Sequence, residues 1–172
     1  IYRVGGAQAV AAMAYGTESI KPVEKIVGPG NKYVVTAKIL VSSDVPVDFP
    51  AGPSEILILA DESADPNLVA LDMISQAEHG VEGTSILVTT SIDLAEKVVK
   101  ELEERIPRSP NAETVFQNLS RNGLVLVCED TEGALAFVNG FAPEHLEVMT
   151  KDAWSVAEKI RSAGLILIGN YT

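Results

Sequence analysis

The two histidines of this chain each directly follow a glutamate, in Gln76-Ala77-Glu78-His79 and in Pro143-Glu144-His145. Imidazole is the side chain best suited to proton transfer near neutral pH, and it is also a common zinc ligand. Each pair lies at a break in the apolar pattern, where one predicted element ends and the next begins. These two segments are therefore the first candidates for chemistry.

The first segment has the spacing of two helical ligands. Gln76 and His79 are three residues apart at the end of a predicted helix, so their side chains share one face. They could bind a metal, although an amide oxygen is a poor zinc ligand and two ligands do not complete a tetrahedral site. By spacing alone, a polar helix end with a capping histidine is the simpler interpretation.

The second segment combines an acid and a base at a turn. Pro143 disfavours helix at Ala142 and forces a turn before the strand predicted at residues 146–149. A carboxylate beside an imidazole, as in Glu144 and His145, could supply two proton-transfer groups to one pocket. Adjacent side chains diverge on an extended chain, so this role requires a turn or a first helical turn. An exposed acidic turn is the alternative.

Short apolar runs alternate with helical patterns along the whole chain, and these elements must position the candidate residues. Runs that are apolar throughout and separated by helices predict a mostly parallel sheet in a three-layer α/β/α, Rossmann-like arrangement. Asp65-Pro66 is a typical helix start. Strands are predicted at residues 2–4, 23–27, 55–60, 85–88, 124–127, 146–149 and 165–168, with those at 55–60, 85–88, 124–127 and 165–168 buried. Helices are predicted at about residues 7–15 and 31–41, from 66 and from 92, and at 112–119, 131–139 and 153–162.

Three small-residue loops share one design, an extended run followed by glycine and then a helix or strand. They are Gly5-Gly6-Ala7-Gln8, Gly28-Pro29-Gly30-Asn31 and Ala51-Gly52-Pro53-Ser54. Ligands of open parallel sheets bind beyond the carboxyl ends of strands, and glycine lets backbone N–H groups approach a phosphate. None of the loops has the Gly-x-Gly-x-x-Gly dinucleotide pattern, so tight βα turns explain them as well.

Composition restricts the partners and the compartment. The net charge of −11 disfavours nucleic acid and anionic membranes as partners. Cys128 is the only cysteine, so no internal disulfide forms, which fits a reducing compartment such as the cytoplasm. No apolar run approaches the roughly 18–20 residues of a membrane span.

The organisation of the chain is suggested by its ends and by one proline-rich stretch. The chain opens and closes beside predicted strands, so both ends are expected to lie inside a longer polypeptide. Residues 42–53 hold three prolines and no helical pattern. They predict either a crossover between two sheets or a long loop within one sheet.

Taken together, these segments resemble the histidinol dehydrogenase family from end to end. Its motifs occur here in the same order: Gly5-Gly6-Ala7-Gln8-Ala9, Ile26-Val27-Gly28-Pro29-Gly30-Asn31, Ala51-Gly52-Pro53-Ser54-Glu55, Ser75-Gln76-Ala77-Glu78-His79, Ala142-Pro143-Glu144-His145-Leu146 and Ser162-Ala163-Gly164. The resemblance implies a zinc-dependent homodimer that uses NAD to oxidise L-histidinol through histidinal to L-histidine in histidine biosynthesis.

The resemblance also implies a role for each matching residue. It assigns zinc to Gln76 and His79, proton acceptance in both oxidations to His145, activation of water to Glu144, substrate contact to Ser54, and NAD contact to Gln8 and Asn31. It further implies two related α/β domains. Residues 1–50 would be the later part of an NAD-contacting domain, and residues 51–172 a domain that carries the zinc and catalytic motifs.

This chain lacks parts of the family's site. The family chain is much longer, and its third protein zinc ligand, an aspartate, lies beyond the segment that matches Gly169–Thr172. Later histidine and glutamate positions, some from the partner subunit, and the upstream part of the NAD site are also absent. The chain alone is therefore expected to be inactive. The rival interpretations are a non-catalytic α/β ligand-binding or structural domain, and another NAD-linked or metal-linked enzyme.

Overall fold

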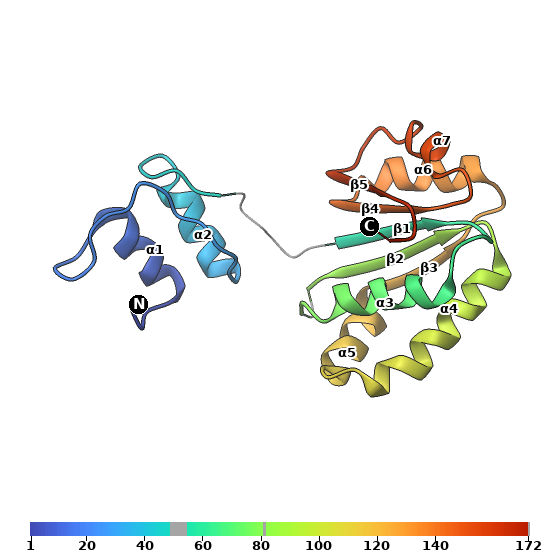
Figure 1. Cartoon of the computed structure of the whole chain (residues 1–172), viewed down its shortest axis with the longest axis horizontal. Coiled ribbons are helices and arrows are strands. Elements are labelled where there is room, and N and C mark those ends of the chain that lie inside the picture. The colour runs from blue at the N-terminus through green and yellow to red at the C-terminus, as the bar shows by residue number, and fades with distance from the viewer. Residues whose placement is uncertain (49–54, 81, 172) are drawn as a thin grey trace. The chain divides into compact units, whose positions relative to one another are not determined.

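The computed structural model describes residues 1–48, 55–80 and 82–171 (Figure 1). The chain forms two compact units, Ile1–Pro53 and Ser54–Thr172, which are described separately below. Within the described ranges, no helix is long and apolar enough to cross a membrane.

The larger unit is built on a five-stranded sheet whose strands all run parallel, as the sequence predicts. The spatial order is β3-β2-β1-β4-β5, so the winding of the chain changes direction between β1 and β4. The strands are β1 (Glu55–Ala60), β2 (Thr84–Thr89), β3 (Gly123–Val127), β4 (His145–Met149) and β5 (Leu165–Ile168).

Helices cover both faces of this sheet, which confirms the three-layer α/β/α prediction (Figure 1). One face is covered by α3 (Pro66–Ala77), α4 (Ile92–Arg105), the 3-10 helix η1 (Ile106–Arg108) and α5 (Ala112–Asn122); the other by α6 (Thr131–Phe141) and α7 (Ala153–Ala157). The Asp65 side chain accepts a hydrogen bond from the backbone N–H of Asn67 and caps α3, with proline at the first helical position.

The core lies on both sides of the central strand. Ile56 and Ile58 of β1 pack under α3, while Leu57 and Leu59 pack under α6. The prediction that four strands are buried holds for β1 and β2 but is wrong for β3 and β5. These are the edge strands, and neither is fully covered: Leu124 is 42% exposed and Leu165 is 49% exposed.

Helix α7 ends five residues earlier than predicted, because a side chain from α6 forms hydrogen bonds with the backbone that follows it. The Asn139 amide donates to the Lys159 carbonyl at 3.2 Å and accepts from the Arg161 N–H at 2.6 Å. The chain between these two residues therefore turns toward α6 and does not continue as helix.

The smaller unit packs two helices, α1 (Gly6–Tyr15) and α2 (Lys32–Val41), around a core of Val10, Ala14, Ile26, Val41 and Val45. Both helices are predicted correctly, but the strands predicted at 2–4 and 23–27 are wrong. Residues 2–4 are exposed and irregular, and the second segment forms one isolated parallel bridge, between Ile26 and Val47. A strand needs a neighbour to bond its backbone groups, and the described part of this unit offers only that short partner.

Candidate functional site

The two histidine segments of the larger unit lie at the same edge of the sheet. Helix α3 returns from the carboxyl ends of the strands to their amino ends, where Gln76 and His79 lie. Glu144 and His145 lie at that edge too, because His145 is the first residue of β4. The site residues are thus at the amino ends of the strands, opposite to the usual ligand crevice of such sheets.

A contact between α3 and β4 sets the level of these residues. Burial and the nearby Asp72 carboxyl of α3 both raise the pKa of Glu147 on β4, so the two carboxyl groups lie close together. Toward the amino edge, Gln76 lies one turn beyond Asp72, about 6 Å along α3. His145 lies two residues before Glu147 on the same face, about 6.6 Å along β4. Gln76 and His145 are therefore displaced from this carboxyl pair by similar distances toward the same edge of the sheet.

The Glu144–His145 pair forms at a sharp end of helix α6. The chain leaves the helix at Ala142, whose φ of 57° is in the left-handed region, and Pro143 prevents the helix from continuing. The turn brings the Glu144 Oε2 to 4.0 Å from the His145 Nδ1, with both side chains about one-third exposed. The turn geometry that a shared role requires is therefore present, and both groups are open to a substrate.

Two residues from other strands hold the backbone of this pair. The Glu55 Oε1 of β1 accepts from the Glu144 N–H at 3.0 Å, and the Leu165 N–H of β5 donates to the Glu144 carbonyl at 2.8 Å. Gly164 permits the close approach of β5, because a Cβ there would lie 2.7 Å from the Glu144 carbonyl oxygen. Glu55 and Gly164 lie inside the sequence motifs. Their role is not evident from the sequence, because it depends on contact with the distant Glu144 backbone.

Gly164→Ala is expected to destabilise the larger unit by about 1–2 kcal/mol, since the methyl group must push the Glu144 backbone and β5 apart. Chemical denaturation followed by circular dichroism measures this. Gly140→Ala is the matched control, because Gly140 is exposed in α6 and its Cβ would meet nothing within 4 Å. It is expected to stabilise by about 0.5–1 kcal/mol. Equal effects of the two changes would contradict the close-approach argument.

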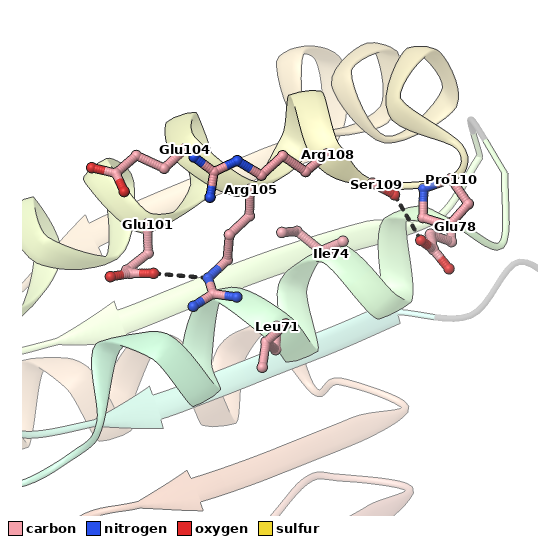
Figure 2. A pocket seen from close by; sticks show the side chains of 9 residues that line it. All are labelled: Leu71, Ile74, Glu78, Glu101, Glu104, Arg105, Arg108, Ser109 and Pro110. Atoms are coloured by element: carbon pink, nitrogen blue, oxygen red, sulfur yellow. Dashed lines mark hydrogen bonds and ion pairs between the residues drawn. The ribbon is translucent and has the colours of Figure 1, made fainter.

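The end of α3 is anchored on the side away from β4. The Glu78 Oε1 accepts from the Ser109 hydroxyl at 2.8 Å, at one end of a groove of about 300 Å³ between α3 and α4 (Figure 2). Arg105 lines the same groove and is bonded to Glu101 at 2.8 Å. The Glu78 side chain is thus occupied by its hydrogen bond to Ser109, and His79 is the exposed residue of this motif.

The loop that follows His79 is held by a buried amide. The Asn118 Nδ2 of α5 donates to the carbonyl oxygens of Gly80 at 2.6 Å and Gly83 at 2.8 Å. Asn118 is fully buried, so these carbonyls are the acceptors it needs. The position of His79 relative to α5 is fixed in this way, a feature that the sequence pattern does not reveal.

Gln76 and His79 are the residues of this chain that are predicted to bind a metal. Within the described ranges, no three His, Cys, Asp or Glu side chains cluster in a way that could hold a metal ion. Gln76 and His79 still fit one corner of a zinc site, because they share the end of α3 and His79 is exposed. A complete tetrahedral zinc site would need further donors from outside these ranges.

The residues predicted to contact NAD belong to the smaller unit. Asn31 caps α2, its Oδ1 accepting from the N–H groups of Tyr33 at 3.1 Å and Val34 at 3.2 Å. Gln8 is exposed in the first turn of α1. Each residue stands at a helix N-terminus beside glycines, which suits an anionic cofactor. Ser54, predicted to contact the substrate, lies outside the described residues.

A second cavity lies at the opposite edge of the larger unit. It has a volume of about 340 Å³ and is lined by residues that follow the carboxyl ends of β1 and β4, among them Asp61, Thr150 and Lys151. It lies at the point where the winding of the sheet reverses. It contains none of the predicted site residues.

Comparison with known proteins agrees with the geometry. The family model described as histidinol dehydrogenase matches residues 1–172. The chain is 52% identical over 169 residues to histidinol dehydrogenase of Methanothermobacter thermautotrophicus, and 51% identical over 173 residues to that of Bacteroides fragilis. These alignments cover 98% and 100% of the chain.

A solved structure matches as well. The crystal structure of histidinol dehydrogenase from Elizabethkingia anophelis is similar with a TM-score of 0.90 and 40% identity, over 100% of this chain. The chain spans 40% of the length of that structure and of both relatives.

Proposed function

Because the chain belongs to the histidinol dehydrogenase family, we propose that it is the part of such an enzyme that carries its proton-transfer pair. The complete protein would oxidise L-histidinol through histidinal to L-histidine with two NAD+. The observation that supports this most directly is the Glu144–His145 pair, 4.0 Å apart and partly exposed, at the edge of the sheet where α3 presents Gln76 and His79.

The first oxidation needs a proton acceptor. As hydride leaves the carbinol carbon for the cofactor, His145 takes the hydroxyl proton, and a C=O bond forms. The imidazolium so formed is stabilised by the Glu144 carboxylate, which lies within ion-pairing distance.

The second oxidation needs water before it needs a base. Glu144 takes a proton from water as the water oxygen bonds to the aldehyde carbon. The His145 imidazolium gives its proton to the carbonyl oxygen, so the product is the neutral hydrate and the imidazole is again free to accept a proton. The hydrate then loses a second hydride to the cofactor, and His145 again accepts a hydroxyl proton. Holding both groups on one turn lets them act on the same carbon in succession.

Two cofactors follow from the family and fit the residues present. Zinc, held in part by Gln76 and His79, would act as a Lewis acid that orients the amino alcohol. NAD+ would accept the hydride and contact Gln8 and Asn31. The complete enzyme would be a homodimer whose partner subunit supplies the remaining groups.

The proposal is tested with the complete protein. Purified with zinc, it is expected to reduce NAD+ when supplied with L-histidinol and to release L-histidine, with two NADH formed per molecule. Binding of histidinol without any NADH formation would favour the non-catalytic ligand-binding alternative.

This chain in isolation is expected to bind zinc more weakly than about 1 µM and to turn over no histidinol. The reason is that two neutral donors compensate poorly for the water that a divalent ion loses. Competition with a zinc-sensitive dye measures the affinity, with His79→Ala as the control. Zinc binding at or below micromolar concentration, lost in the control, would show that this chain holds more of the site than its described donors suggest.

A further inference from the structure

The smaller unit buries a charged lysine that the proposed chemistry does not use. Lys38 lies in the second half of α2 and is only 3% exposed. Its ammonium group forms an ion pair with Asp48 and donates to the Gly28 carbonyl at 3.0 Å. A lysine is almost never buried unless it is paired, so these partners keep it in place.

Asp48 contacts both Lys38 and the backbone of Gly28. Its second carboxylate oxygen accepts from the Gly28 N–H at 2.7 Å. This hydrogen bond and the nearby Lys38 lower the pKa of Asp48, so the carboxylate is charged at neutral pH. The lysine and the aspartate therefore hold the peptide groups on both sides of Gly28.

Gly28 depends on this support, because its backbone bonds to Lys38 and Asp48 are the contacts that hold its conformation among the described residues. Its φ is 133°, which side chains with a Cβ rarely adopt, and a Cβ there would meet no atom within 4 Å. Free glycine visits several backbone regions with little difference in energy. The two hydrogen bonds thus select one conformation for the start of the Gly28-Pro29-Gly30-Asn31 loop.

The rest of the loop is already rigid. Gly30 is pressed against α2, because a Cβ there would lie 2.5 Å from Val34. Asn31 is fixed by capping α2, and Pro29 has a restricted φ. Gly28 is therefore the residue of the loop with the most backbone freedom, and Lys38 of α2 together with Asp48 holds its two peptide groups.

Resting on the proposed function, we propose that Lys38 and Asp48 are positioning residues that hold the Gly28–Asn31 loop ready for the dinucleotide. They do not touch the cofactor in this account. They act by fixing the Gly28 peptides, so that Asn31 and the start of α2 meet the ligand without a prior rearrangement.

The test uses the complete protein with Lys38→Met, Asp48→Asn and, as control, Lys25→Met at an exposed lysine of the same unit. Lys38→Met is expected to raise the dissociation constant for NAD+, measured by titration calorimetry, by about tenfold. KM for NAD+ should rise in parallel while KM for histidinol stays unchanged. Asp48→Asn removes the charge that pairs with the buried Lys38 and disturbs the bond to Gly28, so it should show a rise at least as large. Lys25→Met should show none.

Hydrogen exchange of the Gly28 amide gives a readout that is independent of activity. It is expected to speed up in both loop variants and not in the control. If the variants are less stable but their folded fraction binds NAD+ with unchanged affinity, the residues are only structural and the inference is overturned. If the wild-type protein itself binds no NAD+, the proposed function fails and this inference fails with it. Unchanged NAD+ affinity in the variants, by contrast, overturns this inference alone.

Discussion

Replacing His145 by alanine in the complete enzyme is expected to slow both oxidations, each by about 10²–10⁴-fold. The reason is that each oxidation removes a hydroxyl proton, and His145 is the group placed to accept it beside the Glu144 carboxylate. Rates are measured with histidinol and with histidinal supplied separately, each with NAD+. Loss of one rate alone would show that His145 does not serve both steps.

Glu144→Gln separates the two halves of the same chemistry. An amide cannot take a proton from water, so conversion of histidinal to histidine should suffer more than conversion of histidinol to histidinal. The glutamine keeps the size of the side chain, and the backbone bonds to Glu55 and Leu165 do not involve it. Glu103→Gln, at an exposed position of α4, serves as the control. Equal losses on both substrates would remove the hydration role from Glu144.

Glu147→Gln is expected to make the stability of the larger unit much less dependent on pH. Glu147 is 5% exposed, and its burial, with Asp72 beside it, raises its pKa to about 7 from 4.5. A carboxyl group with a raised pKa stabilises the fold while it is protonated. That contribution is complete below about pH 4.5 and is lost as the pH rises toward 7 and beyond. The wild-type unit should therefore lose about 2–3 kcal/mol between pH 5 and pH 8 relative to the variant.

The measurement is the free energy of unfolding of the chain, from guanidinium titrations followed by circular dichroism at several pH values. A glutamine at 147 can donate a hydrogen bond to Asp72, so the contact between α3 and β4 is kept. Glu103→Gln should follow the wild-type curve, because its carboxyl is exposed. If the free energy of unfolding varies with pH in the same way for wild type and Glu147→Gln, the pKa of Glu147 is not raised in the folded state.

The sequence predicts the elements of the larger unit well, because its strands and helices have distinct apolar periods and clear caps such as Asp65-Pro66. It does not predict features that depend on contacts between elements distant in the sequence. The exposure of Leu165 follows from strand order, and the early end of α7 follows from the Asn139 side chain. Residues 2–4 form no strand because the described residues of the smaller unit offer them no partner strand.

The candidate site likewise contains residues that the sequence identifies and residues that it does not. Residue type and spacing identify Gln76, His79, Glu144 and His145 as candidates, and the fold brings them to one edge of the sheet. Their assigned roles remain predictions from family resemblance. The supporting contacts of Glu55, Gly164 and Asn118 join residues between 20 and 89 positions apart in the sequence, and no local pattern signals them.

Strand β5 makes the Glu144–His145 turn sensitive to local unfolding. It is a four-residue edge strand, and its Leu165 amide bonds to the carbonyl of Glu144 itself. Edge strands open more often than central ones, at a free-energy cost well below that of global unfolding. Each opening of β5 releases one of the two backbone hydrogen bonds that hold Glu144, so the exchange rate of the Leu165 amide reports how often the proposed base loses its alignment. Temperature would then reduce activity by fraying this strand well before the sheet itself melts.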